Sequence, residues 1–233
     1  WKNPGDSGGP IKVKWSHDDN ISISELYWPT PTLIPYEPLM TYGYKNFVIF
    51  PFEINNSNNV NSDIEANIDF LICDDICVPE KAFIKTNLNE IKNDASLYDW
   101  FLKVPSQTLP VKASLDSDFI DIRFSWPFDV SSAIFFIDNQ DIAEHAADQN
   151  LIKEENNYLL KIKKLDDVKS LEYLSGVLSI NDNESFIIDT EIENATQNSL
   201  NISLLQALIF AFVGGLILNL MPCVFPIISL KVL

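Results

Sequence analysis

The sequence predicts a mainly β protein in which two β-sandwich domains precede the first transmembrane α-helix of a truncated membrane domain. Short apolar segments with a two-residue period, separated by Pro, Gly or Asn, recur through residues 1–193, as is typical of a β-sandwich. A helical pattern interrupts them near residue 100, and a long apolar run follows at 204–230. These three observations set the fold class.

The first predicted domain covers residues 1–104. We expect strands at 21–28, 47–54 and 68–72, where apolar residues alternate or run together over strand-like lengths. At 94–103, Asp94 precedes apolar residues at helical spacing before Pro105 ends the pattern. This segment is predicted to be a short helix that closes the domain.

The second predicted domain covers residues 105–193. Its expected strands are 111–115, 119–126, 133–137, 158–162, 176–180 and 186–192. It contains no cysteine, so a spacer or docking role is the default interpretation. His145 lies between Glu144 and Asp148, and a lone histidine among surface acids is expected to be solvated.

Residues 200–233 are expected to begin the membrane domain. No charged side chain occurs from 194 to 229, and a helix needs about 20 apolar residues to cross the hydrocarbon core of a bilayer. Lys231 beyond the run favours an orientation with the N-terminal part outside the cytoplasm. The chain opens at Trp1 and stops just past the run, so we expect an N-terminally truncated fragment of a longer protein.

The charge of the chain excludes some partners. The formal net charge is −17, whereas binding to nucleic acid or to anionic lipid requires clustered Lys and Arg. We therefore expect no nucleic-acid partner and an acidic, solvated surface.

Cys73 and Cys77 are the most informative residues of the soluble part. In a single extended strand their Cα atoms would lie roughly 13 Å apart, far beyond the roughly 4.4–6.8 Å of a disulfide. The chain must therefore fold back between them, and Asp74 and Asp75 are good turn formers. Pro79 limits the strand that follows.

Three interpretations of this pair stay open. A structural disulfide is the usual fate of two extracytoplasmic cysteines. A closed zinc site needs more ligands than two thiolates, so no metal site is predicted, although copper(I) requires fewer ligands. The structural disulfide is the default, but the redox interpretation gains because a bridge across so short a loop adds little stability. The adjacent carboxylates are expected to raise the thiol pKa, so that exchange would depend on a docked partner.

The third cysteine, Cys223, lies within the apolar run between Pro222 and Pro226. Each proline removes a backbone donor and breaks the helix, which is tolerated in a membrane where the backbone lines a cavity or is buried in protein. This setting favours a functional cysteine over a small packing residue. The Gly214-Gly215 pair would permit close packing of another helix.

A second motif points elsewhere. Residues 5–10, Gly-Asp-Ser-Gly-Gly-Pro, match the nucleophile loop of trypsin-like serine proteases. A short cysteine turn and a membrane span do not fit the rest of that fold. We interpret the glycine cluster as a turn between strands.

Several motifs in order resemble one family. Residues 1–8, Tyr27-Trp28-Pro29, Tyr42-Gly43-Tyr44, the 73–79 motif and residues 215–226 resemble the transmembrane thiol:disulfide interchange reductases of the DsbD type, and most closely its ScsB-like copper-tolerance branch. The short Cys73–Cys77 spacing and the second sandwich favour that branch. The resemblance implies immunoglobulin-like sandwiches in a periplasmic region of about 200 residues, attached to a multi-pass protein of the bacterial inner membrane.

The resemblance also implies an activity, protein-disulfide reduction. Electrons would pass from cytoplasmic thioredoxin, through a membrane pair that includes Cys223, to Cys73 and Cys77, with Cys77 facing the partner. No cofactor other than cysteine pairs is expected. The acceptors would be periplasmic thioredoxin-fold proteins in disulfide isomerisation, cytochrome c maturation or copper tolerance. Tyr42 and Tyr44 would belong to a cap that shields the pair, although Thr41 replaces a common aromatic residue there.

Overall fold

The structure, a computed structural model, describes residues 1–56, 61–74, 76–194, 212 and 215. Trp1–Asn194 form one compact unit. Within the described residues, no helix is long and apolar enough to cross a membrane. The span predicted at 204–230 lies almost wholly outside the described residues and stays a prediction.

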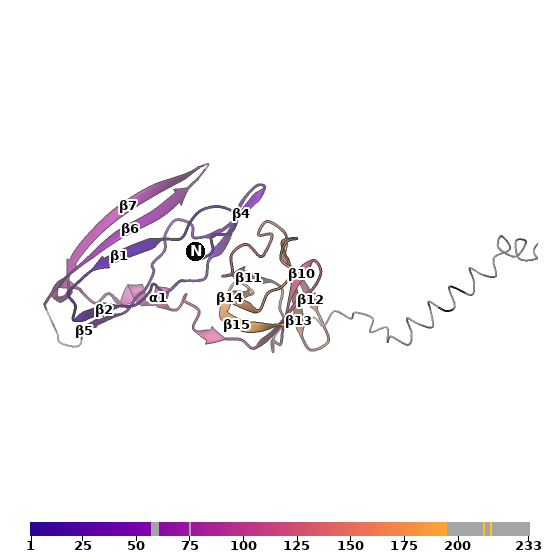
Figure 1. The fold of residues 1–233 in the computed structure, drawn as a ribbon. Coiled ribbons are helices and arrows are strands. Elements are labelled where there is room, and N and C mark those ends of the chain that lie inside the picture. The colour runs from indigo at the N-terminus through magenta and orange to yellow at the C-terminus, as the bar shows by residue number, and fades with distance from the viewer. Residues whose placement is uncertain (57–60, 75, 195–211, 213–214, 216–233) are drawn as a thin grey trace, which may run out of the picture. The chain divides into compact units, whose positions relative to one another are not determined.

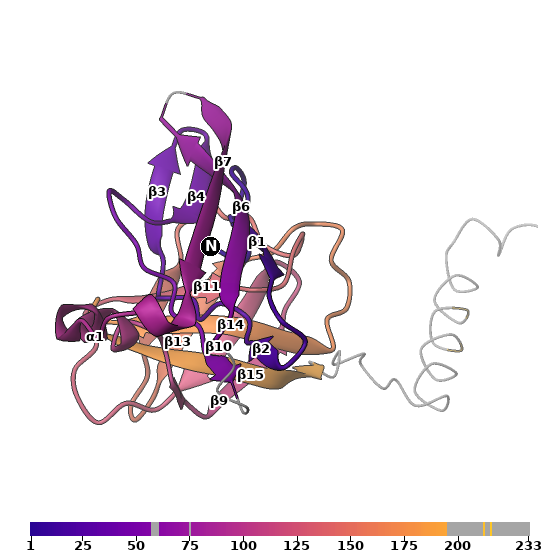
Figure 2. The same cartoon turned by 90° about the vertical axis from the view of Figure 1, so that its left-hand side faces the viewer.

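A three-stranded antiparallel sheet dominates the first half of this unit (Figure 1). Its strands, in spatial order, are β1 (Lys12–Ser16), β6 (Asp63–Cys73) and β7 (Cys77–Asn87). Two smaller antiparallel pairs accompany it: β2 (Ile21–Ile23) with β5 (Ile54–Asn56), and β3 (Thr32–Tyr36) with β4 (Leu39–Gly43). The tips of the β3–β4 and β6–β7 hairpins lie side by side in both ribbon views (Figures 1 and 2).

Short helical turns connect the two halves. They are the 3₁₀ turns η1 (Leu88–Glu90) and η2 (Ala95–Leu97) and the one-turn helix α1 (Tyr98–Phe101). The helix predicted at 94–103 is therefore much shorter than expected. Asp94 accepts a hydrogen bond from the backbone N–H of Leu97 through its own carbonyl, which makes a tight turn in place of a full N-terminal helical turn.

An eight-stranded sheet forms the second half. Its strands are β8 (Gln107–Thr108), β9 (Val111–Leu115), β10 (Phe119–Phe124), β11 (Ala133–Ile137), β12 (Asn150–Lys153), β13 (Tyr158–Lys163), β14 (Tyr173–Ile180) and β15 (Glu184–Asn194). The order is β11-β14-β15-β9-β10-β13-β12, and β8 pairs with β15. The long β15 is antiparallel to β14 and then parallel to β9, so it joins the two parts of the sheet.

The main hydrophobic core belongs to this second sheet. Ile120, Phe135 and Leu178 are completely buried in it. Trp1 and Tyr42, from the first half of the chain, are part of the same buried cluster. The ring of Tyr42 meets that of Phe136 edge to face, with 5.3 Å between centroids. The two halves therefore share packed side chains.

The predicted mainly β class is confirmed, and the strands predicted in the second half agree closely with β9, β10, β11, β13, β14 and β15. The strand predicted at 47–54 is wrong for most of its length, because β5 begins at Ile54. Pro51 lies within that segment and lacks a backbone donor, which interrupts a strand ladder. The division into domains 1–104 and 105–193 stays a prediction.

Candidate functional site

The cysteine pair closes the end of the β6–β7 hairpin. Cys73 and Cys77 face each other across the two strands and form a disulfide, with their Cα atoms 4.0 Å apart. The backbone N–H of Asp74 donates to the carbonyl of Ile76 in the turn. The chain therefore folds back between the cysteines, as the geometric argument from sequence requires.

The two strands of the hairpin are paired along its whole length. Eleven residue pairs join β6 to β7, from Asp63 with Asn87 to Cys73 with Cys77. On one face, Lys85 pairs with Glu65 at 2.9 Å and Lys81 with Asp69 at 3.2 Å. Opposite charges across antiparallel strands favour this pairing over a one-residue slip, which would place each side chain on the other face.

The end of the hairpin projects beyond the sheet. Strand β1 pairs with β6 only as far as Asp69, so among the described strands none pairs with residues 70–73 on that side. Both cysteines are exposed, and Ile76 between them is 73% exposed. A partner therefore reaches the disulfide without any rearrangement of the hairpin.

The β3–β4 hairpin faces the disulfide across a cavity of about 530 Å³. Cys73 and Cys77 line one side of this cavity, and Leu39, Tyr42 and Tyr44 are among the residues on the other. The role of the two tyrosines in a cap stays a prediction. Their hydroxyl groups are bonded elsewhere, however. The Tyr44 hydroxyl donates to the carbonyl of Pro29 at 2.7 Å, and the Tyr42 hydroxyl shares a hydrogen bond with His145.

The glycine-rich segment at 5–10 fixes strand β4. Gly5 has a φ of +80°, and a Cβ there would lie 2.5 Å from the carbonyl oxygen of Met40. The Asp6 carboxylate accepts a hydrogen bond from the backbone N–H of Met40 at 2.8 Å, and the hydroxyl groups of Ser7 and Thr41 are hydrogen-bonded. The segment is the turn that the sequence predicts, and its serine is engaged in holding β4.

His145 is a residue whose environment the sequence did not reveal. It is half-buried, with its Nδ1 3.1 Å from the Tyr42 hydroxyl oxygen and its ring edge to face with that of Tyr42. The expectation of a merely solvated histidine is therefore wrong. Its partner lies 103 residues earlier, and no local pattern signals a contact of that range.

Burial sets the protonation of these groups. Desolvation lowers the pKa of His145, and the carboxylates of Asp6 and Asp141 oppose that shift. Desolvation also raises the pKa of the Tyr42 and Tyr44 hydroxyl groups far above their usual range. The Tyr42 and Tyr44 side chains that line the cavity are therefore neutral at pH 7.

Other predicted site residues are not placed. Cys223, Pro222 and Pro226 lie outside the described residues, so the membrane site stays a prediction. Across the described ranges, no group of three or more His, Cys, Asp or Glu side chains is arranged to hold a metal ion.

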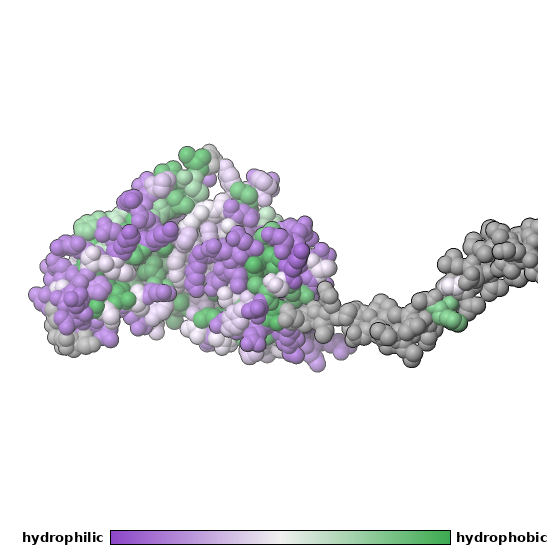
Figure 3. Space-filling view, viewed as in Figure 1, coloured by the Kyte–Doolittle hydropathy of each residue, from purple (hydrophilic) through white to green (hydrophobic). Residues whose placement is uncertain are grey.

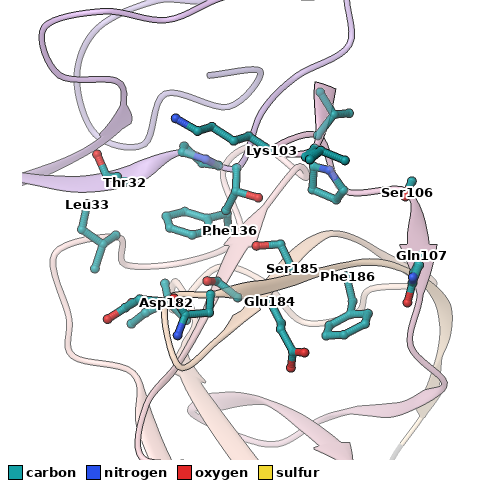
Figure 4. Close-up of a pocket in the computed structure, with 18 residues that line it drawn as sticks. Thr32, Leu33, Lys103, Ser106, Gln107, Phe136, Asp182, Glu184, Ser185 and Phe186 are labelled. Atoms are coloured by element: carbon teal, nitrogen blue, oxygen red, sulfur yellow. The ribbon is translucent and has the colours of Figure 1, made fainter. Parts of the chain in front are cut away.

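A larger cavity of about 690 Å³ lies next to β3 and β15, away from the disulfide (Figure 4). Its lining includes Lys103, Asp182 and Glu184 but no cysteine or histidine. The Lys103 ammonium lies 3.8 Å from the ring centroid of Trp100 and makes a cation–π contact with it. This cavity carries no group suited to redox chemistry, so the disulfide cavity is the candidate site.

The fold and the site define a mainly β protein with a disulfide exposed at the end of a hairpin. Residues 1–88 match the family model of the thiol:disulfide interchange protein DsbD, N-terminal. The resemblance that the sequence motifs predicted is thereby confirmed. A comparison with curated proteins finds no significant match.

One solved structure extends the likeness beyond residue 88. The crystal structure of the N-terminal periplasmic domain of ScsB from Proteus mirabilis superimposes with a TM-score of 0.64 at 18% identity, covering 82% of this chain and 81% of that one. At this identity the likeness concerns the fold. It includes strands from both halves of the chain, because residues 1–88 alone make up a much smaller share.

Proposed function

We propose that this chain is the extracytoplasmic part of a thiol:disulfide reductase, in which Cys73 and Cys77 pass electrons to the disulfides of other proteins. The observation that carries the proposal is the exposed disulfide at the end of a projecting hairpin, in a chain whose residues 1–88 match the DsbD family model. The two strands of the hairpin are paired along their whole length, which supports a role for the bond other than fixing the strand register.

The reaction begins from the reduced pair. The thiolate of Cys77 attacks one sulfur of a partner disulfide, and the other partner sulfur leaves as a thiolate that takes up a proton. The thiolate of Cys73 then attacks the sulfur of Cys77, releasing the partner's second thiol and forming the Cys73–Cys77 bond. The partner gains two electrons, and the pair loses them. The 4.0 Å between the two Cα atoms keeps the resolving sulfur close to the mixed disulfide.

The proposal extends to the membrane. Residues 200–233 begin a multi-pass domain of the bacterial inner membrane, residues 1 to about 200 are periplasmic, and Cys223 belongs to the pair that reduces Cys73–Cys77 again with electrons from cytoplasmic thioredoxin. The sequence supports this because a proline on each side of the sulfur would interrupt a membrane helix there. The acceptors are periplasmic thioredoxin-fold disulfide proteins that serve disulfide isomerisation, cytochrome c maturation or copper tolerance.

The reduction potential of the Cys73–Cys77 bond tests the proposal. Structural disulfides of secreted proteins have potentials below about −300 mV, whereas exposed exchange pairs lie higher. Equilibration of the full chain with glutathione or dithiothreitol buffers, in a Cys223→Ser background in detergent, should give a value well above that limit. A value below the limit would instead assign the bond a structural role in a membrane-anchored interaction module.

Copper(I) binding is the second candidate, because two adjacent thiols at an exposed turn are soft ligands for that ion. Titration of the reduced chain with copper(I) tests it. Tight stoichiometric binding that is lost in Cys73→Ser would favour copper binding. Absence of binding, with disulfide exchange intact, would leave the reductase.

A further inference from the structure

The cavity beside the disulfide is a built, mainly apolar recess. It measures about 530 Å³, within the range of sites that bind small ligands or single side chains. Apolar side chains of both hairpins and of the segment before β5 line it: Ile34, Leu39, Phe50, Phe70 and Leu71. Because Cys73 and Cys77 are also lining residues, a group that fills the recess lies directly beside the sulfur atoms.

The rim of the recess exposes apolar side chains on both hairpins. Tyr36 and Leu39 of the β3–β4 hairpin are 49% and 37% exposed, and the lining residues Leu71 and Ile76 of the β6–β7 hairpin are 36% and 73% exposed. Apolar surface is visible at both hairpin tips in the space-filling view (Figure 3). Clustered apolar surface of this kind marks an interaction site.

The charge around the recess is mainly negative. Asp74 is the lining residue that carries a formal charge. Glu37, in the turn between Tyr36 and Leu39, and Glu80, opposite Phe70, are exposed. Lys81 is paired with Asp69 at 3.2 Å. Lys45, which follows the lining residue Tyr44 in the chain, is an exposed cation. The net charge of −17 strengthens the field.

We propose that the recess between the β3–β4 and β6–β7 hairpins is a specificity site for a partner protein whose reactive cysteine is flanked by one apolar side chain and by Lys or Arg. The apolar side chain enters the recess beside Cys73 and Cys77, and the partner's cation faces Asp74. This inference rests on the proposed reductase function and names the chemistry of its partner. The recess selects the partner by contacts outside the sulfur atoms, which suits a pair with no activating cation of its own in the turn.

Four matched peptides test the proposal. Each carries one cysteine in a mixed disulfide with 5-thio-2-nitrobenzoate, flanked by Leu or Ser and, two positions away, by Lys or Glu. The full chain is used in detergent in the Cys223→Ser background, with Cys73 and Cys77 reduced. Each turnover oxidises the pair to its disulfide and releases the peptide thiol and the coloured thiolate, whose absorbance gives the rate.

The peptide with Leu and Lys should react about tenfold faster than the peptide with Ser and Glu at low salt, from apolar burial and charge together. At 0.5 M NaCl the preference for Lys should shrink and the preference for Leu should persist.

Leu39→Ser and, separately, the highly exposed Ile76→Ser should remove the preference for Leu. Asp74→Asn should reduce the preference for Lys. Ile152→Ser, at a 45% exposed position on β12, is the matched control and should change neither preference.

Equal rates with all four peptides would overturn the specificity site while leaving the reductase in place. No release from any peptide would overturn both. A chain that sediments as a dimer in detergent, and becomes monomeric with Leu39→Ser, would assign the recess to a second copy of the chain and contradict the proposal.

Discussion

The Nδ1 atom of His145 lies 3.1 Å from the hydroxyl oxygen of Tyr42, and this contact joins the second sheet to the hairpin beside the disulfide. Tyr42 belongs to β4, which lines the disulfide cavity, whereas His145 lies between β11 and β12. The ring of Tyr42 also packs on Phe136 of β11. The second half of the chain thus supports the wall that faces the cysteines, which is more than a spacer would do.

Removal of this hydrogen bond should destabilise the chain modestly. In Tyr42→Phe the ring packing remains, but the half-buried His145 loses its partner, and we expect a loss of about 1–2 kcal/mol in the free energy of unfolding. Denaturant unfolding of the full chain in detergent measures it. His17→Ala is the matched control, because exposed His17 bonds only to the neighbouring carbonyl of Asp18, and its stability should be unchanged. Equal losses in the two variants would contradict the assigned role of the contact.

The same histidine should make stability depend on pH. Desolvation lowers the pKa of His145 in the folded chain below the unfolded value of about 6.5. Between the two pKa values the unfolded state binds the proton and the folded state does not. The free energy of unfolding is therefore highest above about pH 6.5 and falls as the pH is lowered towards the folded pKa.

The difference between the wild type and His145→Gln, measured by unfolding from pH 7.5 to 5.5, isolates this effect. Burial raises the pKa of Asp138, so the contribution of Asp138 to stability increases as the pH falls. Asp138 is present in both proteins, and its contribution cancels in the difference. The stability of the wild type should decline more steeply towards pH 5.5 than that of His145→Gln. Parallel curves would show that His145 titrates equally in the folded and unfolded states.

The charge of Asp74 should slow disulfide exchange. A carboxylate one residue from Cys73 disfavours the thiolate form that attacks a disulfide. Asp74→Asn should therefore speed the reaction of the reduced pair with the neutral 2,2′-dithiodipyridine by about twofold to fivefold near pH 7. Asp118→Asn, in the turn before β10, serves as the control. An unchanged rate in Asp74→Asn would remove the electrostatic argument.

The sequence predicts the strands of the second half well because their apolar residues are dictated by burial. Ile120, Ile122 and Leu160 are completely buried, so their positions must be apolar. The first half is harder to predict. In β7 most side chains are exposed, including Phe83 and Ile84, so no solvent-facing alternation marks the strand. Strand β3 contains Pro35, which argues against a strand unless the strand lies at an edge.

The candidate site was predictable where its chemistry is local. The turn between Cys73 and Cys77 is predictable because cysteines four positions apart can form a disulfide only if the chain folds back between them. The walls of the cavity were not predictable in the same way. Leu39 and Ile76 meet the same recess from hairpins that are distant in sequence, and the pairing of His145 with Tyr42 spans 103 residues.

Loss of the disulfide should leave the hairpin folded. In the loop-entropy account, a bridge between residues so close in sequence contributes about 2 kcal/mol at most. The ladder from Asp63 with Asn87 to Ile72 with Val78 supplies ten further residue pairs that hold the strands together. The Cys73→Ser, Cys77→Ser double variant should therefore unfold with a similar denaturant dependence and a small loss of stability. The protection of the β6 and β7 amides against hydrogen exchange should be the same in the wild type and in the double variant, apart from the last residue pairs before the turn. General loss of protection in both strands would mean that the bond maintains the hairpin, and a redox role would then require partial unfolding at every turnover.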